Sequence, residues 1–193
     1  MTGDSGGFSC FRFDGEKDNV KFHTHVFTLE IVPPPAPSMT KISKFRTFMS
    51  DFAQIVNIAA FSTDQFQSAG LRQDVKDDLG LTDIRLSLDS SDVPFIMWVR
   101  SLMEKAIKMR YVQKLQTEVE EAEHDLKRRR IIKKSGSTDD LFQSVVGAWY
   151  LSETVGSDVG NIDDLLGEYN NINVVGQHAY KRMLAKLGYK VRR

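Results

Sequence analysis

Lysine and arginine gather in two short segments of the chain, and both segments could bind phosphate. The first reads KRRRIIKK over residues 127–134, and the second reads AYKRMLAKLGYKVRR over residues 179–193. Six of the fifteen residues in the second segment are Lys or Arg, and none is acidic. Guanidinium and ammonium groups bind phosphate oxygens by charge-assisted hydrogen bonds, so both segments are candidate contacts for a nucleic acid.

Each basic segment also has a simpler interpretation. We expect KRRRIIKK at the end of a long helix, where the helix dipole favours positive charge, and such clusters are common on solvated faces. The same composition fits a nuclear-targeting signal. The C-terminal cations could instead pair with residues 139–168 of a neighbouring copy, because that block has seven acidic side chains and no Lys or Arg.

The C-terminal segment is predicted to be a folded amphipathic helix. Projected at 100° per residue, residues 176–187 place apolar side chains on one side and gather Lys181, Arg182 and Lys186 on the other. Gly188 is expected to end this helix. The nucleic-acid-binding residues predicted from the two segments are Lys127, Arg128, Arg129, Arg130, Lys133, Lys134, Lys181, Arg182, Lys186, Tyr189, Lys190, Arg192 and Arg193.

The C-terminal pattern of an acidic helix, a connector and a basic helix that runs into LGYKVRR distantly resembles winged-helix modules at the ends of viral primase-helicases. The match is loose and confined to this part of the chain, and we do not identify the chain as a member of that family. The resemblance implies that the six terminal cations face phosphates and that Tyr189 lies near a base or sugar.

Two other motifs suggest catalysis or metal binding. GDSGG at residues 3–7 matches the nucleophile loop of trypsin-like serine proteases, but that family places its His and Asp before the Ser, and only four residues precede Ser5 here. We therefore expect no enzyme activity. His23 and His25 share one face of an expected strand, a spacing that metal sites use. No third ligand is local, so we predict no metal and no cofactor, while the histidine pair leaves a metal as an open alternative.

A narrow apolar stripe runs through the charged middle of the chain. Its residues are three and four apart, as in the a and d positions of a coiled coil, although two heptads are a short pattern. They are Val112, Leu115, Val119, Ala122 and Leu126. We predict that this stripe meets a partner helix and supports a homo-oligomer.

The elements that position these residues are expected to form a mainly α protein of the α+β class. Residues 1–37 are predicted to be an N-terminal arm with a β-hairpin and the Pro-rich connector PPPAP. Residues 38–134 are predicted to be a helical bundle body that ends in one long, protruding helix. Residues 135–193 are predicted to be a small three-helix unit with a basic terminal helix. The arm could add strands to a neighbouring copy.

Composition limits the class of protein. The 193 residues have a formal net charge of zero, so attraction to phosphate must come from local patches. The single cysteine excludes an internal disulfide, and the apolar runs are far shorter than the roughly 20 residues of a membrane-spanning helix. We expect an intracellular protein without a membrane span, cytoplasmic or nuclear, with association with a virion as a further setting.

The function predicted from these observations is non-enzymatic binding or packaging of nucleic acid by a self-associating protein. A small viral nucleocapsid-like protein or a replication accessory protein would fit, with electrostatic and weakly sequence-specific affinity for RNA or DNA. The alternative is a protein–protein adaptor or scaffold that oligomerises through the stripe at residues 112–126 and binds no nucleic acid.

Overall fold

The computed structural model describes residues 6–32, 42–62, 90–136 and 138–155, together with Gln73, Lys76, Asp77, Gly80, Thr82, Ile84 and residues 86–88. The strands in this part are β1 (Gly6–Lys17), β2 (Val20–Ile31), β3 (Ile107–Lys108), β4 (Glu123–Asp125) and β5 (Arg130–Ile132). The helices are α1 (Ile42–Ile55), α3 (Val93–Met103), α4 (Gln113–Glu121) and α5 (Asp140–Val155). Most of the expected C-terminal unit, including its basic helix, lies outside the described residues.

The first two strands form a long antiparallel hairpin. Asp18 and Asn19 connect them, both in the left-handed region with φ of 53° and 61°, as a type I′ turn requires. The short side chains of Asp and Asn tolerate this conformation, and the turn matches the twist of the flanking strands. β3 pairs in parallel with the middle of β2, so the sheet order is β1-β2-β3.

Two register shifts interrupt the pairing of β1 with β2, and the first of them lies between Cys10 and Phe11. Cys10 pairs with Phe27 and Phe11 pairs with His25, which leaves Val26 as an extra residue in β2. Side chains alternate between the faces of a strand, so one extra residue exchanges the faces beyond it. The uninterrupted alternation expected along β2 is therefore broken at Val26.

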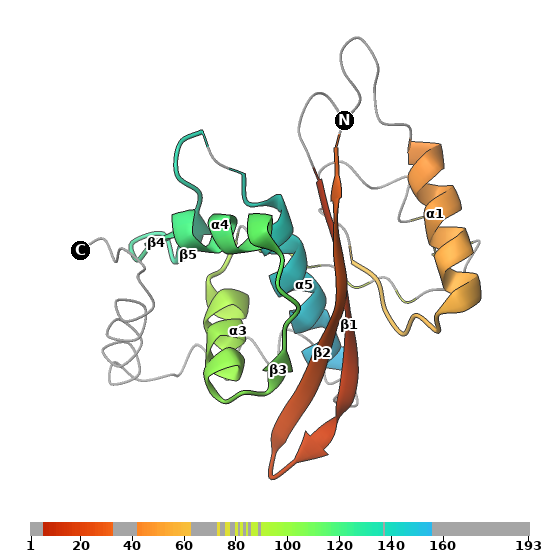
Figure 1. Ribbon diagram of the computed structural model, residues 1–193, viewed down its shortest axis with the longest axis horizontal. Helices are drawn as coiled ribbons and strands as arrows, with labels where there is room; N and C mark the ends of the chain where they lie inside the picture. The colour runs from red at the N-terminus through yellow and green to blue at the C-terminus, as the bar shows by residue number, and fades with distance from the viewer. Residues whose placement is uncertain are drawn as a thin grey trace.

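The hairpin is an inner layer of the fold rather than a free arm. It lies between α1 on one side and α5, with α3 and α4, on the other (Figure 1). The ring of Phe8 packs edge-on against Phe45 and Phe48 of α1, with centroids 5.7 and 5.3 Å apart. On the opposite face, the Ser9 hydroxyl lies 2.7 Å from that of Ser144 in α5.

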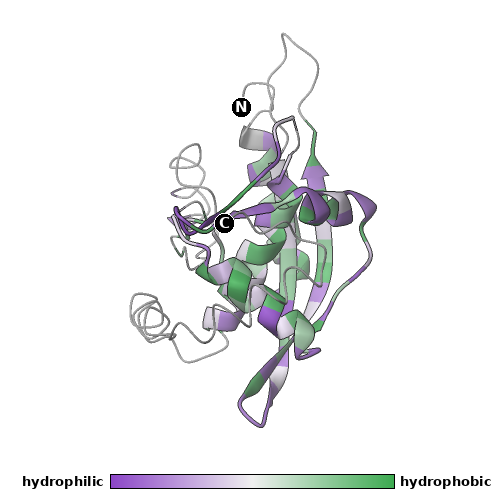
Figure 2. Ribbon diagram, turned by 90° about the vertical axis from the view of Figure 1, so that its left-hand side faces the viewer, coloured by the Kyte–Doolittle hydropathy of each residue, from purple (hydrophilic) through white to green (hydrophobic). Residues whose placement is uncertain are grey.

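The main core is built around α5. Val145, Val146 and Trp149 of this helix are completely buried, and α3, α4 and β3 supply further buried residues such as Trp98 and Leu115. Figure 2 shows hydrophobic residues concentrated inside the molecule and hydrophilic ones at the far turn of the long hairpin. This core combines residues from all three of the domains predicted from the sequence. No helix among the described residues is long and apolar enough to cross a membrane.

A buried carboxylate from α4 fixes the beginning of α5. One oxygen of Glu118 accepts a hydrogen bond from the backbone N–H of Phe142, and the other accepts one from the Thr138 hydroxyl, both at 2.8 Å. The first N–H groups of a helix have no partner inside the helix, and negative charge there is favoured by the helix dipole. Glu118 therefore connects the orientation of α4 to the start of α5.

The segment expected to form one long helix is divided into five elements. α3 ends at Met103, and Lys105 then adopts a left-handed φ of 57°. β3 hydrogen-bonds beside β2, with the His23 N–H donating to the Ala106 carbonyl at 2.9 Å. α4 ends before Ala122, whose ψ of 138° is extended, and the β4–β5 hairpin follows.

The prediction of a mainly α protein with a helical bundle and one protruding helix is therefore wrong. In the part of the chain that the structure describes, helices α1, α3, α4 and α5 occur together with five strands, so the fold is mixed. The reason is tertiary packing: Ile107 and Lys108 pair with β2, which offers a hydrogen-bonding edge that the sequence pattern did not reveal.

Replacing Gly7 tests the close approach of β1 to α5. A Cβ at this position would lie 2.2 Å from the Asp140 carbonyl oxygen and 2.6 Å from the Ser144 hydroxyl, so backbone would have to move. We expect Gly7→Ala to lower the free energy of unfolding by about 1–3 kcal/mol, the usual range for overpacking, in urea titrations followed by tryptophan fluorescence. Gly6→Ala is the control, because its Cβ would meet nothing closer than 3.8 Å. Equal effects of the two changes would contradict this account.

Candidate functional site

β4 and β5 form a small antiparallel hairpin that carries the first basic segment. We call residues 123–134 the basic hairpin. Asp125 closes its turn, because one carboxylate oxygen accepts the backbone N–H groups of Arg128 at 3.1 Å and of Lys127 at 3.0 Å. These bonds, chiefly the one from Arg128, lower the pKa of Asp125. Lys127, Arg128 and Arg129 thus lie on a tight, hydrogen-bonded turn, and Lys133 and Lys134 follow β5. The sequence had suggested instead that these cations lie at the end of a helix.

Two exposed cations on the basic hairpin have distant, half-buried carboxylate partners. Arg128 lies 3.8 Å from Asp125 and is 68% exposed, and Lys133 lies 3.6 Å from Asp139 and is 53% exposed. Exposed ion pairs contribute at most about 1 kcal/mol. A phosphate group could therefore replace either carboxylate at little cost, and an arginine can bind it with two parallel hydrogen bonds.

Arg129 and Arg130 are more closely tied to the fold than their neighbours. The Arg129 guanidinium lies 3.7 Å from the buried carboxylate of Asp92, whose other oxygen accepts a hydrogen bond from His124 Nε2 at 2.7 Å. Asp92 immediately precedes α3, so this contact links the basic hairpin to the start of that helix. The Nε of Arg130 is buried. Of the predicted binding residues on the basic hairpin, Arg130 is half-buried, and Lys127, Arg128, Arg129, Lys133 and Lys134 are exposed.

The remaining predicted binding residues cannot be placed relative to the basic hairpin. Lys181, Arg182, Lys186, Tyr189, Lys190, Arg192 and Arg193 all lie outside the described residues. Their part in binding nucleic acid therefore stays a prediction.

The apolar stripe predicted to oligomerise lies mostly against the core of the same chain. Leu115 and Ala122 are each 5% exposed, and Val112 and Val119 pack against the core cluster. Leu126 is half-buried in the turn of the basic hairpin, beyond the end of α4. These residues do not form a continuous stripe on one helix, although oligomerisation itself stays a prediction.

The structure also brings together a group of residues that the sequence analysis missed. Lys105, Lys108, Arg110 and Tyr111 are all exposed around β3 and the extended segment that follows it. We call these four residues the β3 strip. The alternation of apolar and basic residues in AIKMRYV was the available signal, but it was interpreted as part of a helix.

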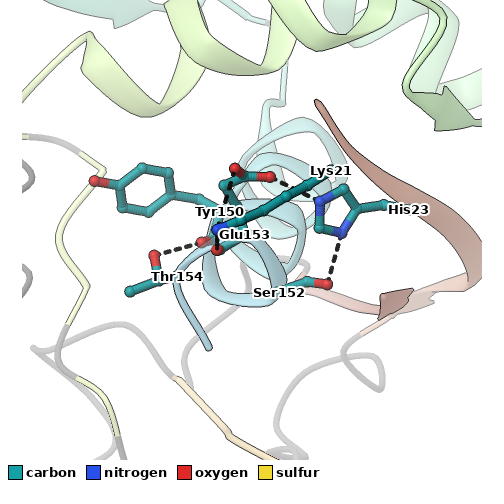
Figure 3. Close-up of polar contacts among 6 residues, drawn as sticks. All are labelled: Lys21, His23, Tyr150, Ser152, Glu153 and Thr154. Carbon is teal, nitrogen blue, oxygen red and sulfur yellow. Dashed lines mark hydrogen bonds and ion pairs between the residues drawn. The ribbon is translucent and has the colours of Figure 1, made fainter. Parts of the chain in front are cut away.

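A polar cluster on the face of the sheet opposite Lys108 fixes β2 to the last turn of α5 (Figure 3). The buried His23 ring lies with Nε2 2.7 Å from the Glu153 carboxylate and Nδ1 2.9 Å from the Ser152 hydroxyl. Since a carboxylate only accepts, Nε2 donates, and in the neutral ring Nδ1 accepts from Ser152. Lys21 donates to the backbone carbonyl of Glu153 at 3.0 Å, which satisfies one of the free carbonyls at the helix end.

The connectivity of Ser152, His23 and Glu153 is that of a nucleophile, a base and an acid. A Ser-His-acid site also needs the hydroxyl and imidazole to reach a substrate. The His23 side chain is 0% exposed and packs against Trp149 and Phe13. We therefore interpret the cluster as a structural connection between β2 and α5.

The second histidine of the predicted pair begins a chain of hydroxyl groups across the same face. His25 Nε2 lies 2.7 Å from the Thr28 hydroxyl, which lies 2.8 Å from that of Ser9, and Ser9 contacts Ser144. Ser144 donates its single hydroxyl proton to the Leu141 carbonyl, so it must accept from Ser9. By the same reasoning Ser9 accepts from Thr28, and Thr28 accepts from Nε2 of His25. No group of three or more metal-ligating side chains occurs among the residues that the structure describes.

Comparisons of the chain with protein-family models, with curated proteins and with solved structures find no match.

The pH dependence of stability tests the buried state of His25. Burial lowers the pKa of this imidazole below its ordinary value of about 6.5, and the charge of Arg110 adds to the effect. As pH falls below about 6.5, the unfolded chain takes up a proton at His25 that the folded chain resists, so stability is lost. We expect the free energy of unfolding to fall less between about pH 8 and pH 5 in His25→Gln than in the wild type.

Ser9→Ala is the control for this measurement. It breaks the hydroxyl chain but keeps the imidazole, so it should lower stability at every pH and retain the wild-type slope. A His25→Gln protein with the wild-type slope would show that His25 does not titrate as its burial requires.

Proposed function

We propose that this protein binds nucleic acid through the basic hairpin, by electrostatic contacts to the phosphate backbone and without catalysis. The observation that carries the proposal is the set of exposed cations on the basic hairpin, of which Arg128 and Lys133 lie 3.8 and 3.6 Å from their carboxylate partners. Five exposed cations, Lys127, Arg128, Arg129, Lys133 and Lys134, gather within one small hairpin. Because the whole chain is neutral, such a local patch is what would attract a polyanion.

Hydrogen bonds hold the basic hairpin in one conformation, which favours binding to phosphate. Asp125 holds the turn by two backbone hydrogen bonds, and the His124–Asp92 pair fixes its base to α3. A preorganised set of cations loses less conformational entropy when it binds than a flexible tail does. Contacts to phosphate carry no sequence information, so the affinity would be weakly sequence-specific, as in a packaging or replication accessory protein.

The alternative function, a scaffold that oligomerises through the apolar stripe, has less support. Its central residues Leu115 and Ala122 are already buried within one chain, so an apolar interface at the stripe would require the core to open. Self-association in any other form remains a prediction from the sequence.

The proposal is tested with a triple variant, Lys127→Gln, Arg128→Gln and Lys133→Gln. Arg129 and Arg130 are kept because Arg129 contacts Asp92 and part of Arg130 is buried. Binding to short RNA and DNA oligonucleotides, single- and double-stranded, is measured by fluorescence anisotropy between about 50 and 200 mM salt. We expect the wild type to bind more weakly as salt rises, and the variant to lose roughly tenfold in affinity with a shallower salt dependence.

A charge-matched control removes three exposed cations elsewhere, by Lys17→Gln, Lys44→Gln and Arg46→Gln. These residues lie on β1 and α1, across the molecule from the basic hairpin (Figure 1). The control should bind like the wild type. If both triple variants lose the same affinity, binding depends on total charge and the proposed site is wrong. If the wild type binds no oligonucleotide at low salt, the proposed function itself is wrong.

A further inference from the structure

Tyr111 is the most exposed large aromatic side chain on the described surface, at 78%. It lies in the extended segment between β3 and α4, outside both elements. Single exposed apolar residues are common on proteins and need no explanation by themselves. Tyr111 differs from other exposed apolar residues because cations lie close to it in the sequence, at Lys108 and Arg110.

From Ile107 to Arg110, buried or half-buried side chains alternate with exposed ones. Ile107 is buried and Met109 packs against the core, while Lys108 and Arg110 project to solvent. Tyr111 follows Arg110 directly. Neighbouring side chains of an extended chain point to opposite sides, yet Arg110 and Tyr111 are both exposed, so the alternation ends here and a nucleic-acid strand that passes this segment could contact both.

The positive charge continues across the sheet from β3. Lys108 aligns with Thr24 of β2, and Thr24 aligns with Arg12 of β1, so the two cations lie on the same face in a row across three strands. The lowered pKa of Asp14 agrees with this placement, because a hydrogen bond from Thr24 and then the charges of Arg12 and Lys108 lower it. Two cations therefore flank one carboxylate on this part of the sheet.

We propose that the β3 strip binds single-stranded nucleic acid, with Tyr111 stacked on an unpaired base and Lys108 and Arg110 on the backbone phosphates. A row of cations interspersed with an exposed aromatic ring is the arrangement that single-strand-binding surfaces share. A duplex keeps the faces of its bases covered, so it could meet the cations but not the ring.

This inference rests on the proposed function and specifies its substrate. The β3 strip lies at one end of α4 and the basic hairpin at the other. The helix rises 1.5 Å per residue, so its nine residues separate the two surfaces by about 14 Å. The exposed side chains between them include the uncharged Gln113, Gln116 and Thr117, and Gln116 donates to the Glu120 carboxylate at 2.7 Å. One strand could therefore contact both surfaces.

The test compares Tyr111→Ala with Tyr111→Phe on three ligands. They are a single-stranded oligonucleotide, the matched duplex, and an abasic strand with the same sugar-phosphate backbone. Affinity is measured by fluorescence anisotropy at one low salt concentration. We expect Tyr111→Ala to bind the single strand roughly tenfold more weakly, because the stacked base is lost, and Tyr111→Phe to bind like the wild type. Neither change should alter binding to the duplex or the abasic strand.

Met103→Ala is the matched control, since Met103 is also exposed, at 57%, and lies at the end of the neighbouring helix α3. It should bind all three ligands like the wild type. Both exposed positions allow the variants to fold, which the free energy of unfolding verifies.

The outcomes separate this inference from the function on which it rests. If Tyr111→Ala binds the single strand like the wild type while the basic-hairpin variant loses affinity, the β3 strip is not a base-stacking site and the proposed function stands. If Tyr111→Ala weakens binding to the abasic strand equally, the ring does not stack on a base. Absence of wild-type binding to all three ligands overturns both proposals.

Discussion

The close approach of β1 to α5 is the constraint on which the rest of the fold depends. The backbone of Gly7 lies against the first turn of α5, where even a methyl group has no room. At this separation, the hydroxyl groups of Ser9 and Ser144 can meet, and further along the same face His23 reaches the last turn of the helix. Glu118 fixes the beginning of α5 from the other side. The helix is therefore held at both ends, and α3, α4 and the sheet are positioned by packing against it.

Elements that depend on local interactions could be predicted from the sequence, and elements that depend on residues far apart in the chain could not. The hairpin of β1 and β2 could be anticipated because period-two alternation and a turn between the strands are local signals. The division of residues 93–134 could not, because it depends on β2 offering an edge to Ile107, far away in sequence. A segment rich in helix-forming residues was therefore assigned to one helix, and tertiary pairing overrode that preference.

The candidate site shows the same difference. The cations of KRRRIIKK were identified from composition alone, but their presentation on a turn closed by Asp125 required the structure. The β3 strip was missed, although the alternation from Ala106 to Val112 was visible, because the helical interpretation of its surroundings took precedence. The histidine pair was found by its spacing, but its partners were not. His23 contacts Ser152 of α5, and His25 contacts Thr28, which shares its face of β2 because Val26 is an extra residue between them.

The distance in sequence between the hairpin and α5 has a consequence for the order in which the chain becomes structured during its synthesis. Ser9 and Ser144 are 135 residues apart, a stretch that a ribosome needs roughly 7 to 27 seconds to add at ordinary elongation rates. During that interval the face of the hairpin that packs on α5 has no helix to cover it, and transiently exposed hydrophobic surface favours misassembly with other chains. Nascent copies emerging side by side on one messenger would be the first candidates for such misassembly, so the spacing of ribosomes along the message bears on how much native protein is made.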